Sequence, residues 1–159
     1  MGQEPYVEEY TIQAGDFTAI GEASTKFRAT LKMLGIPSEV VRRAAVVAYE
    51  AEMNAMIHAG GGTIRMKVTS DHLEIFAADQ GPGIPDVALA MQEGYSTASD
   101  EIRELGFGAG MGLPNIERNS DGMNIETEVG VGTTLTARIN FPGQGSLPRT
   151  GVAGSSGTT

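Results

Sequence analysis

Residues 49–59 read YEAEMNAMIHA and lie within a longer pattern that predicts one amphipathic helix. The pattern begins near Pro37-Ser38, and the glycine run at 60–62 ends it. Its apolar stripe follows helical spacing and consists of Val40, Ala44, Val47, Ala48, Ala51 and Ala55. This stripe predicts a helix with one face buried against a sheet or a second helix.

A row of polar side chains follows the edge of this stripe. Glu50, Asn54 and His58 recur every four residues and therefore share one face of the helix. A carboxylate and an amide oxygen on adjacent turns can place a general base beside a ligand for a hard cation. The same spacing also fits a solvated helix edge, and His58 alone fits a structural histidine better than a ligand.

The segments before this helix predict a strand and another helix. Residues 6–13 alternate loosely, as in a strand. Asp16 is a candidate N-cap for a helix that Gly35 and Pro37 end. The helical spacing in that segment is carried by Phe17, Ile20, Ser24, Phe27, Leu31 and Leu34.

The segments after it predict two antiparallel hairpins. Residues 64–68 and 73–79 flank a turn at Ser70-Asp71, and residues 124–129 and 133–141 flank a second turn. We therefore expect an α+β fold, a two-layer sandwich of a mixed, mostly antiparallel sheet with helices on one face. The domain is expected over residues 1–142, followed by a flexible Gly/Ser/Thr-rich tail at 143–159.

Composition excludes several classes of function. The net charge of −9 argues against binding to nucleic acid or to an anionic membrane surface. Cysteine is absent, which excludes disulfides and thiolate chemistry. The first ten residues do not resemble a secretion signal, and no apolar run is long enough to span a bilayer. We expect a cytoplasmic protein.

The stretch ADQGPGIPD at 78–86 places a carboxylate at the end of a predicted strand. Gly81 and Gly83 permit positive φ and a close approach of the backbone to a ligand. The Asp79 carboxylate can accept a hydrogen bond from an exocyclic amine such as adenine N6, whereas it would repel the O6 of guanine. For this stretch taken alone, an ordinary Asp/Gly/Pro turn is the favoured interpretation.

The stretch GFGAGMGL at 106–113 has glycine at every second position from Gly106 to Gly112. Such a segment exposes backbone N–H groups that suit phosphate oxygens, and residues 113–118 resume a helical pattern. It is neither a GxxxxGK[ST] loop nor a GxGxxG loop. Without a phosphate-binding lysine, a metal ion must do more of the work. A flexible linker remains open for this stretch alone.

A fourth glycine-containing stretch, GVGTT at 130–134, joins the last two predicted strands. Its glycines predict a tight hairpin, and Thr133 or Thr134 offers a hydroxyl beside it. Taken alone, the stretch is a β-turn.

These four motifs, in this order on this pattern of helices and strands, resemble the GHKL superfamily of Bergerat-fold ATPases and kinases. The resemblance covers about residues 6–141. It implies that Asn54 ligates Mg²⁺, that Glu50 is the general base, and that Asp79 reads adenine N6 with help from Gly83. Gly108, Gly110 and Gly112 would line the phosphates of ATP or ADP under a lid. The implied nucleotide-binding set is Asn54, Asp79, Gly81, Gly83, Ile84, Arg103, Gly108, Ala109, Gly110, Met111, Gly112, Leu113 and Thr133, the last acting through water.

Within the superfamily, NAMIHA, AGGGTI, DQGPGIPD and GYST resemble the anti-sigma-factor and stressosome switch kinases. The resemblance implies a serine/threonine protein kinase that transfers the γ-phosphate of Mg·ATP to a STAS-domain antagonist. It also implies a sigma factor as a second kind of partner, and a homodimer. Histidine kinases usually carry Asn at the position of Glu50, and a base here fits transfer to a hydroxyl.

The insert DEIRELGF at 100–107 makes a longer lid than this group leads us to expect. Arg103 in the insert fits either a contact with the γ-phosphate or a salt bridge with Glu101 or Glu104. Two other functions stay open: an ATP-dependent switch that binds its partner without phosphorylating it, and a stand-alone histidine-kinase-like ATPase domain. We interpret LPRTG at 147–151 as chance or cloning-derived sequence.

Overall fold

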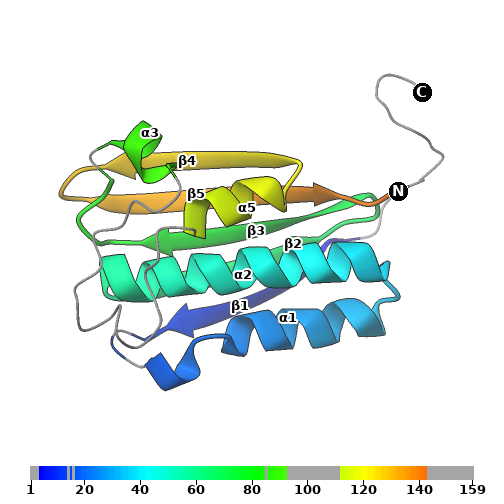
Figure 1. Ribbon diagram of the computed structural model, residues 1–159. Coiled ribbons are helices and arrows are strands. Elements are labelled where there is room, and N and C mark those ends of the chain that lie inside the picture. The colour runs from blue at the N-terminus through cyan, green and yellow to red at the C-terminus, as the bar shows by residue number, and fades with distance from the viewer. Residues whose placement is uncertain (1–3, 14, 16, 85, 93–111, 143–159) are drawn as a thin grey trace.

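The computed structural model describes residues 4–13, 15, 17–84, 86–92 and 112–142 of the 159-residue chain. Five strands form one sheet in the order β1-β2-β3-β5-β4 (Figure 1). The strands are β1 (Tyr6–Ile12), β2 (Gly62–Val68), β3 (His72–Asp79), β4 (Gly122–Glu128) and β5 (Gly132–Asn140). All four pairings between these strands are antiparallel, so the described sheet lacks the parallel pairing that a mixed sheet would have.

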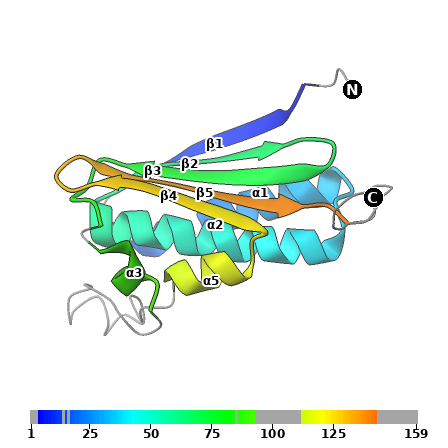
Figure 2. The same ribbon diagram turned by 90° about the horizontal axis from the view of Figure 1, so that it is seen from above.

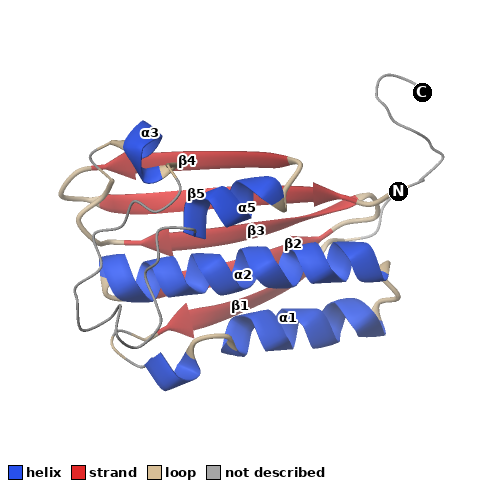
Figure 3. Ribbon diagram, in the orientation of Figure 1, coloured by secondary structure: helices blue, strands red, loops and turns tan. Residues whose placement is uncertain are grey.

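Three helices lie on one face of this sheet (Figure 2). They are α1 (Glu22–Met33), α2 (Ser38–Ala59) and α5 (Gly112–Arg118). Helix α2 is the central one, because it contacts strands β1, β2, β3 and β5 and lies between α1 and α5 (Figure 3). Two single turns complete the described part, η1 (Phe17–Ala19) and α3 (Val87–Ala90). The predicted two-layer α+β sandwich is therefore confirmed.

The core lies between the sheet and the helices. The stripe predicted for α2 is buried throughout, and the alternation of Ile64, Met66 and Val68 in β2 points those side chains towards it. Phe27 and Leu31 of α1 and Ile116 of α5 have no exposed surface. Because this core fixes α2 against four strands, polar residues at the edge of α2 have defined positions relative to the strand ends.

Helix α1 begins at Glu22, whereas the cap predicted at Asp16 would start it at residue 17. Asp16 itself lies outside the described part. Gly21 is the N-cap, with φ 100°, and no side-chain hydrogen bond of its own caps the helix. The Glu52 carboxylate on α2 accepts the Gly21 N–H at 2.9 Å instead. A contact between residues so far apart in the sequence cannot be found from local cap signals.

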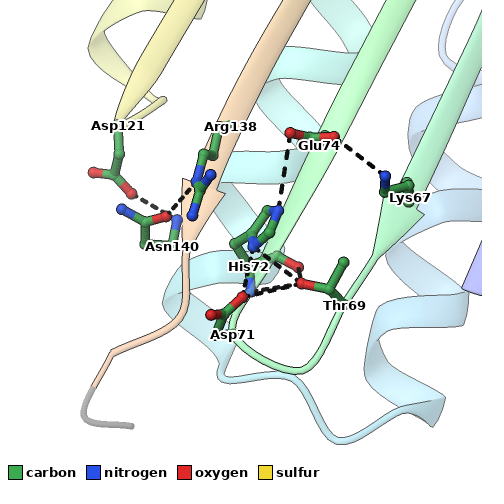
Figure 4. A network of polar contacts seen from close by, with 8 residues as sticks. All are labelled: Lys67, Thr69, Asp71, His72, Glu74, Asp121, Arg138 and Asn140. Carbon is green, nitrogen blue, oxygen red and sulfur yellow. Dashed lines mark hydrogen bonds and ion pairs between the residues drawn. The ribbon is translucent and has the colours of Figure 1, made fainter. Parts of the chain in front are cut away.

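Side chains at the turn between β2 and β3 form a network of hydrogen bonds (Figure 4). The Thr69 hydroxyl lies 3.0 Å from His72 Nδ1, and Asp71 lies 2.6 Å from the same nitrogen. Hydrogen bonding from His72 lowers the pKa of Asp71. Since β3 runs from His72 to Asp79, this network marks the end of the sheet opposite to the strand end at Asp79.

Candidate nucleotide-binding site

A pocket of about 110 Å³ that is partly open to solvent lies where β3 ends and β5 begins. The C-terminal half of α2 forms one wall, and the loop after β3 and the start of α5 form the others. Most of its lining is apolar, as is typical of small-molecule sites. The lining residues are Ala51, Asn54, Ala55, His58, Ala59, Ala77, Asp79, Pro82, Gly83, Ile84, Leu113, Thr133 and Leu135.

Asp79 is the acidic residue in this wall, and backbone donors fix its orientation. Its Oδ1 accepts the Gly81 N–H at 2.9 Å and the Thr133 N–H at 3.3 Å. Both of these bonds engage the same oxygen, so Oδ2 remains for a donor on a ligand. A carboxylate held in this way in an apolar wall suits an exocyclic amine.

The loop after Asp79 is tied to the β4–β5 hairpin. The Ile84 N–H donates to Thr127 Oγ1 at 2.8 Å, and the Gly130 N–H donates to the Pro82 carbonyl at 2.9 Å. Gly83 has φ 80°, and a Cβ there would lie 2.6 Å from the Glu128 carbonyl oxygen. Only glycine therefore fits this close approach.

Thr127 also lies 2.9 Å, oxygen to oxygen, from the hydroxyl of Thr133. Because β4 and β5 pair these two threonines directly, both hydroxyls face the helical layer. One side chain on β4 thus connects the loop carrying Ile84 with the pocket residue Thr133.

Asn54 lines the pocket from α2, and the start of α5 approaches it closely. A Cβ on Gly112 would lie 2.8 Å from Asn54 Oδ1, so glycine at this position leaves room for the amide. Leu113, the next residue, is 8% exposed and joins the pocket wall. The first turn of α5 therefore closes one side of the pocket against Asn54.

Glu50 lies one helical turn before Asn54 and is not among the pocket-lining residues. Its Oε2 accepts a hydrogen bond of 3.0 Å from Asn115 Nδ2 on α5. Glu50 is half-buried. The carboxylate is thus held beside the pocket, on the side where Asn54 meets α5.

His58 completes the polar row of α2 and lines the same pocket. Burial lowers its pKa, which favours the neutral imidazole. The sequence favoured a structural histidine over a ligand here. The structure places His58 in the pocket wall, and the structural role stays a prediction.

The structure brings most of the predicted set together. Asn54, Asp79, Gly83, Ile84, Leu113 and Thr133 line one pocket, and Gly112 contacts Asn54. Gly81 lets the loop pack closely against α2, because a Cβ there would lie 2.6 Å from Ala59. Five predicted residues lie outside the described part of the chain: Arg103, Gly108, Ala109, Gly110 and Met111.

These residues fit a purine nucleotide with a divalent cation. The apolar walls suit a planar base, Asp79 offers an acceptor for its amine, and Asn54 lines the same pocket with an amide that a side chain on residue 112 would crowd. No group of three or more acidic or histidine side chains that could hold a metal occurs among the described residues. A magnesium ion at Asn54 would therefore take most of its ligands from phosphates and water, as is usual for Mg²⁺.

Residues 39–143 match the family of histidine kinase-, DNA gyrase B- and HSP90-like ATPases. The chain belongs to this family, and the predicted superfamily is confirmed. Among its relatives is the serine/threonine-protein kinase RsbT of Bacillus subtilis (strain 168). RsbT is 33% identical over 114 residues, which are 69% of this chain and 80% of RsbT. The prediction of a kinase of this family agrees with that relative.

Anti-sigma F factors are similar to this chain as well. The protein from Caldanaerobacter subterraneus subsp. tengcongensis is 36% identical over 91 residues, which are 54% of this chain and 60% of that factor. A solved structure titled as the SiaB–SiaC complex from Pseudomonas aeruginosa contains a chain with the same fold. It aligns with a TM-score of 0.58 at 15% identity and covers 86% of this chain and 90% of that one.

Sequence reasoning missed two residues that organise the site. Thr127 lies within the predicted strand 124–129, but the sequence pattern defined no register for this hairpin, and the structure is what places Thr127 opposite Thr133. Asn115 gave no local signal, since its partner Glu50 lies 65 positions away in the sequence. Among the described residues, no helix has both the length and the apolar character needed to cross a bilayer.

Proposed function

We propose that the protein is an ATP-dependent serine/threonine protein kinase of the anti-sigma and switch type. The observation that carries this proposal is the placement of three side chains, two on one face of α2 and one at the end of β3. Glu50 stands beside the pocket, Asn54 stands at its wall one turn later, and Asp79 faces the same pocket from the end of β3. Similarity to RsbT over 80% of that kinase supports the same activity.

In this proposal, Asp79 selects adenine by accepting a hydrogen bond from N6, and Thr133 assists through water. Asn54 would be the protein ligand of Mg²⁺, which neutralises charge on the phosphates when bound. Glu50 accepts the proton of a Ser or Thr hydroxyl on the partner as the hydroxyl oxygen forms its bond to the γ-phosphorus. The bond from that phosphorus to the β–γ bridging oxygen breaks, and ADP leaves.

The partner in this proposal is a small STAS-domain antagonist that carries the accepting hydroxyl. A sigma factor is the second kind of partner, and the kinase acts in the cytoplasm as a homodimer. Light scattering of the purified protein at micromolar concentration tests the dimer, and a monomeric mass would remove that part of the proposal.

The test of the activity is incubation of the protein with Mg²⁺, γ-labelled ATP and the STAS antagonist from the same genome. We expect label on the antagonist and none when ATP or Mg²⁺ is omitted. Normal ATP binding without any label on the antagonist would contradict the proposed kinase.

A second function is favoured by the similarity to anti-sigma F factors. In this alternative, ATP occupancy alone controls binding to a sigma factor. The variant Glu50→Gln separates the two functions. If it regulates its partner as well as the wild type does, catalysis is dispensable.

A further inference from the structure

We propose that Asn115 is a positioning residue that orients the carboxylate of Glu50 for proton abstraction. This inference rests on the proposed kinase function. Its basis is the hydrogen bond from Asn115 Nδ2 to Glu50 Oε2, 3.0 Å long, which joins α5 to α2 across 65 positions of sequence.

A second contact fixes the direction of the Asn115 amide. Arg118 NH1 donates to Asn115 Oδ1 at 3.0 Å. A guanidinium can only donate hydrogen bonds, so the amide oxygen must face Arg118. The NH₂ group must then face Glu50, whose ionised carboxylate can only accept. The hydrogen-bonding chemistry of these groups therefore sets the order Arg118, Asn115, Glu50.

The helix that carries Asn115 is packed firmly against the core. Leu113, Pro114 and Ile116 of α5 are all buried, and Ile116 has no exposed surface. The Asn115 carbonyl also accepts a hydrogen bond from Asn119 Nδ2 at 2.9 Å. Because this donor is fixed in place, its hydrogen bond restricts the rotation of the Glu50 side chain before substrate binds. Without it, Glu50 would lose that conformational freedom only on binding.

The geometry also leaves one carboxylate oxygen for the reaction. Asn115 engages Oε2, so Oε1 is the oxygen placed to accept the proton of an incoming hydroxyl. The same short helix begins at Gly112, against the Asn54 amide. Helix α5 therefore sets both the proton acceptor and the space around the proposed metal ligand.

The variant Asn115→Leu tests this role, because it keeps a similar volume and removes the donor. Misplacing a reacting group by about 1 Å can lower a rate by about 100-fold. We expect kcat for transfer to the antagonist to fall about 10- to 100-fold, with KM for ATP within about twofold of wild type. The control is Asn124→Leu, the same substitution at an exposed position of β4 on the face of the sheet opposite to the helices, which should keep kcat within about twofold.

A double variant distinguishes positioning from a structural role. In the Glu50→Gln background, Asn115→Leu should cause little further loss of kcat, because the group it orients is already disabled. An equal loss in both backgrounds, or wild-type kcat in Asn115→Leu, would overturn the inference. Thermal unfolding of each variant shows that the comparison is made between folded proteins.

Failure of the kinase proposal gives a different result. If the wild type transfers no phosphate, the proposed kinase function is wrong, and the kinetic comparison of the Asn115 variants cannot be made. The hydrogen bond is then examined directly, by following the side-chain amide resonances of Asn115 in ¹H–¹⁵N spectra. We expect these resonances to move in Glu50→Gln and to remain in place in Glu117→Gln. Unchanged resonances in Glu50→Gln would overturn the contact itself.

Discussion

The two ends of the site are built in different ways. At the end near Asp79, main-chain groups do most of the work: the N–H groups of Gly81 and Thr133 hold the carboxylate, and the Ile84 N–H binds Thr127. At the end near Glu50, side chains on two helices meet, and the main contact is the single bond from Asn115. The end at which we propose base recognition is therefore part of the sheet framework, whereas the end at which we propose transfer depends on how α5 packs against α2.

This difference predicts that nucleotide binding and phosphate transfer can be altered separately. Substitutions at the Glu50 end change side chains that leave the sheet untouched. Substitutions at the Asp79 end disturb a network that also holds two loops together.

Glu50→Gln should have the largest effect, and only on transfer. Loss of a general base typically lowers the chemical step by about 10²- to 10⁴-fold. We expect this loss in kcat for the antagonist, with ATP affinity within about twofold of wild type. Phosphotransfer assays and titration calorimetry measure the two quantities. Glu117→Gln on the exposed side of α5 is the matched control, and an equal loss there would show that the effect is not specific to Glu50.

Asp79→Asn should weaken nucleotide binding while leaving transfer intact at saturating ATP. The new amide presents a donor where Oδ2 faced the adenine amine, and losing a charge-assisted hydrogen bond costs about 1–3 kcal/mol. That corresponds to a Kd for ATP about 5- to 150-fold higher, measurable by calorimetry. Asp86→Asn, which keeps an oxygen for the Leu89 N–H, is the control. Unchanged affinity in Asp79→Asn would show that the adenine assignment is wrong.

Thr127→Val should affect the framework that the Asp79 end shares. The substitution removes the oxygen that accepts the Ile84 N–H and contacts the Thr133 hydroxyl. We expect a loss of about 1–2 kcal/mol in the free energy of unfolding and a few-fold weaker ATP binding. Urea unfolding measures the first and calorimetry the second. Thr136→Val, on the opposite face of the sheet, should change ATP affinity little; an equal change there would contradict the role of Thr127.

The smallest effect concerns the pH dependence of stability. Burial lowers the pKa of His58, so the folded protein resists the proton that the unfolded chain accepts. The stability linked to this group is present above the unfolded pKa of about 6.5 and is lost as the pH falls below it. We expect the melting temperature to drop between pH 7 and pH 5.5, and the drop to be smaller in His58→Phe. An equal drop in both proteins would assign the pH dependence to other groups.

Much of the fold could be predicted because its signals are local. The stripe of α2, the alternation of β2 and the glycines of both hairpins specify elements that the structure shows at nearly the predicted bounds. The start of α1 was placed too early because its cap comes from Glu52 on another helix. Local sequence carries no record of that contact.

The same limit applies to the site. Glu50, Asn54 and Asp79 could be found because each belongs to a short motif with a recognisable spacing. Asn115 and the pocket-facing position of His58 depend on how α5 and the strand ends pack against α2, which no spacing reveals. The glycine-rich stretch contributes Gly112 to the described site, where lack of a side chain leaves room for the Asn54 amide.

The proposed kinase activity is tested by the chemistry of the phosphate found on the antagonist. The antagonist is incubated with the kinase and Mg·ATP, treated with acid, and mapped by mass spectrometry. Our account predicts one acid-stable phosphate on a Ser or Thr of the antagonist, absent with Glu50→Gln. An acid-labile phosphate on a histidine, or no phosphate at all despite normal ATP binding, would contradict it.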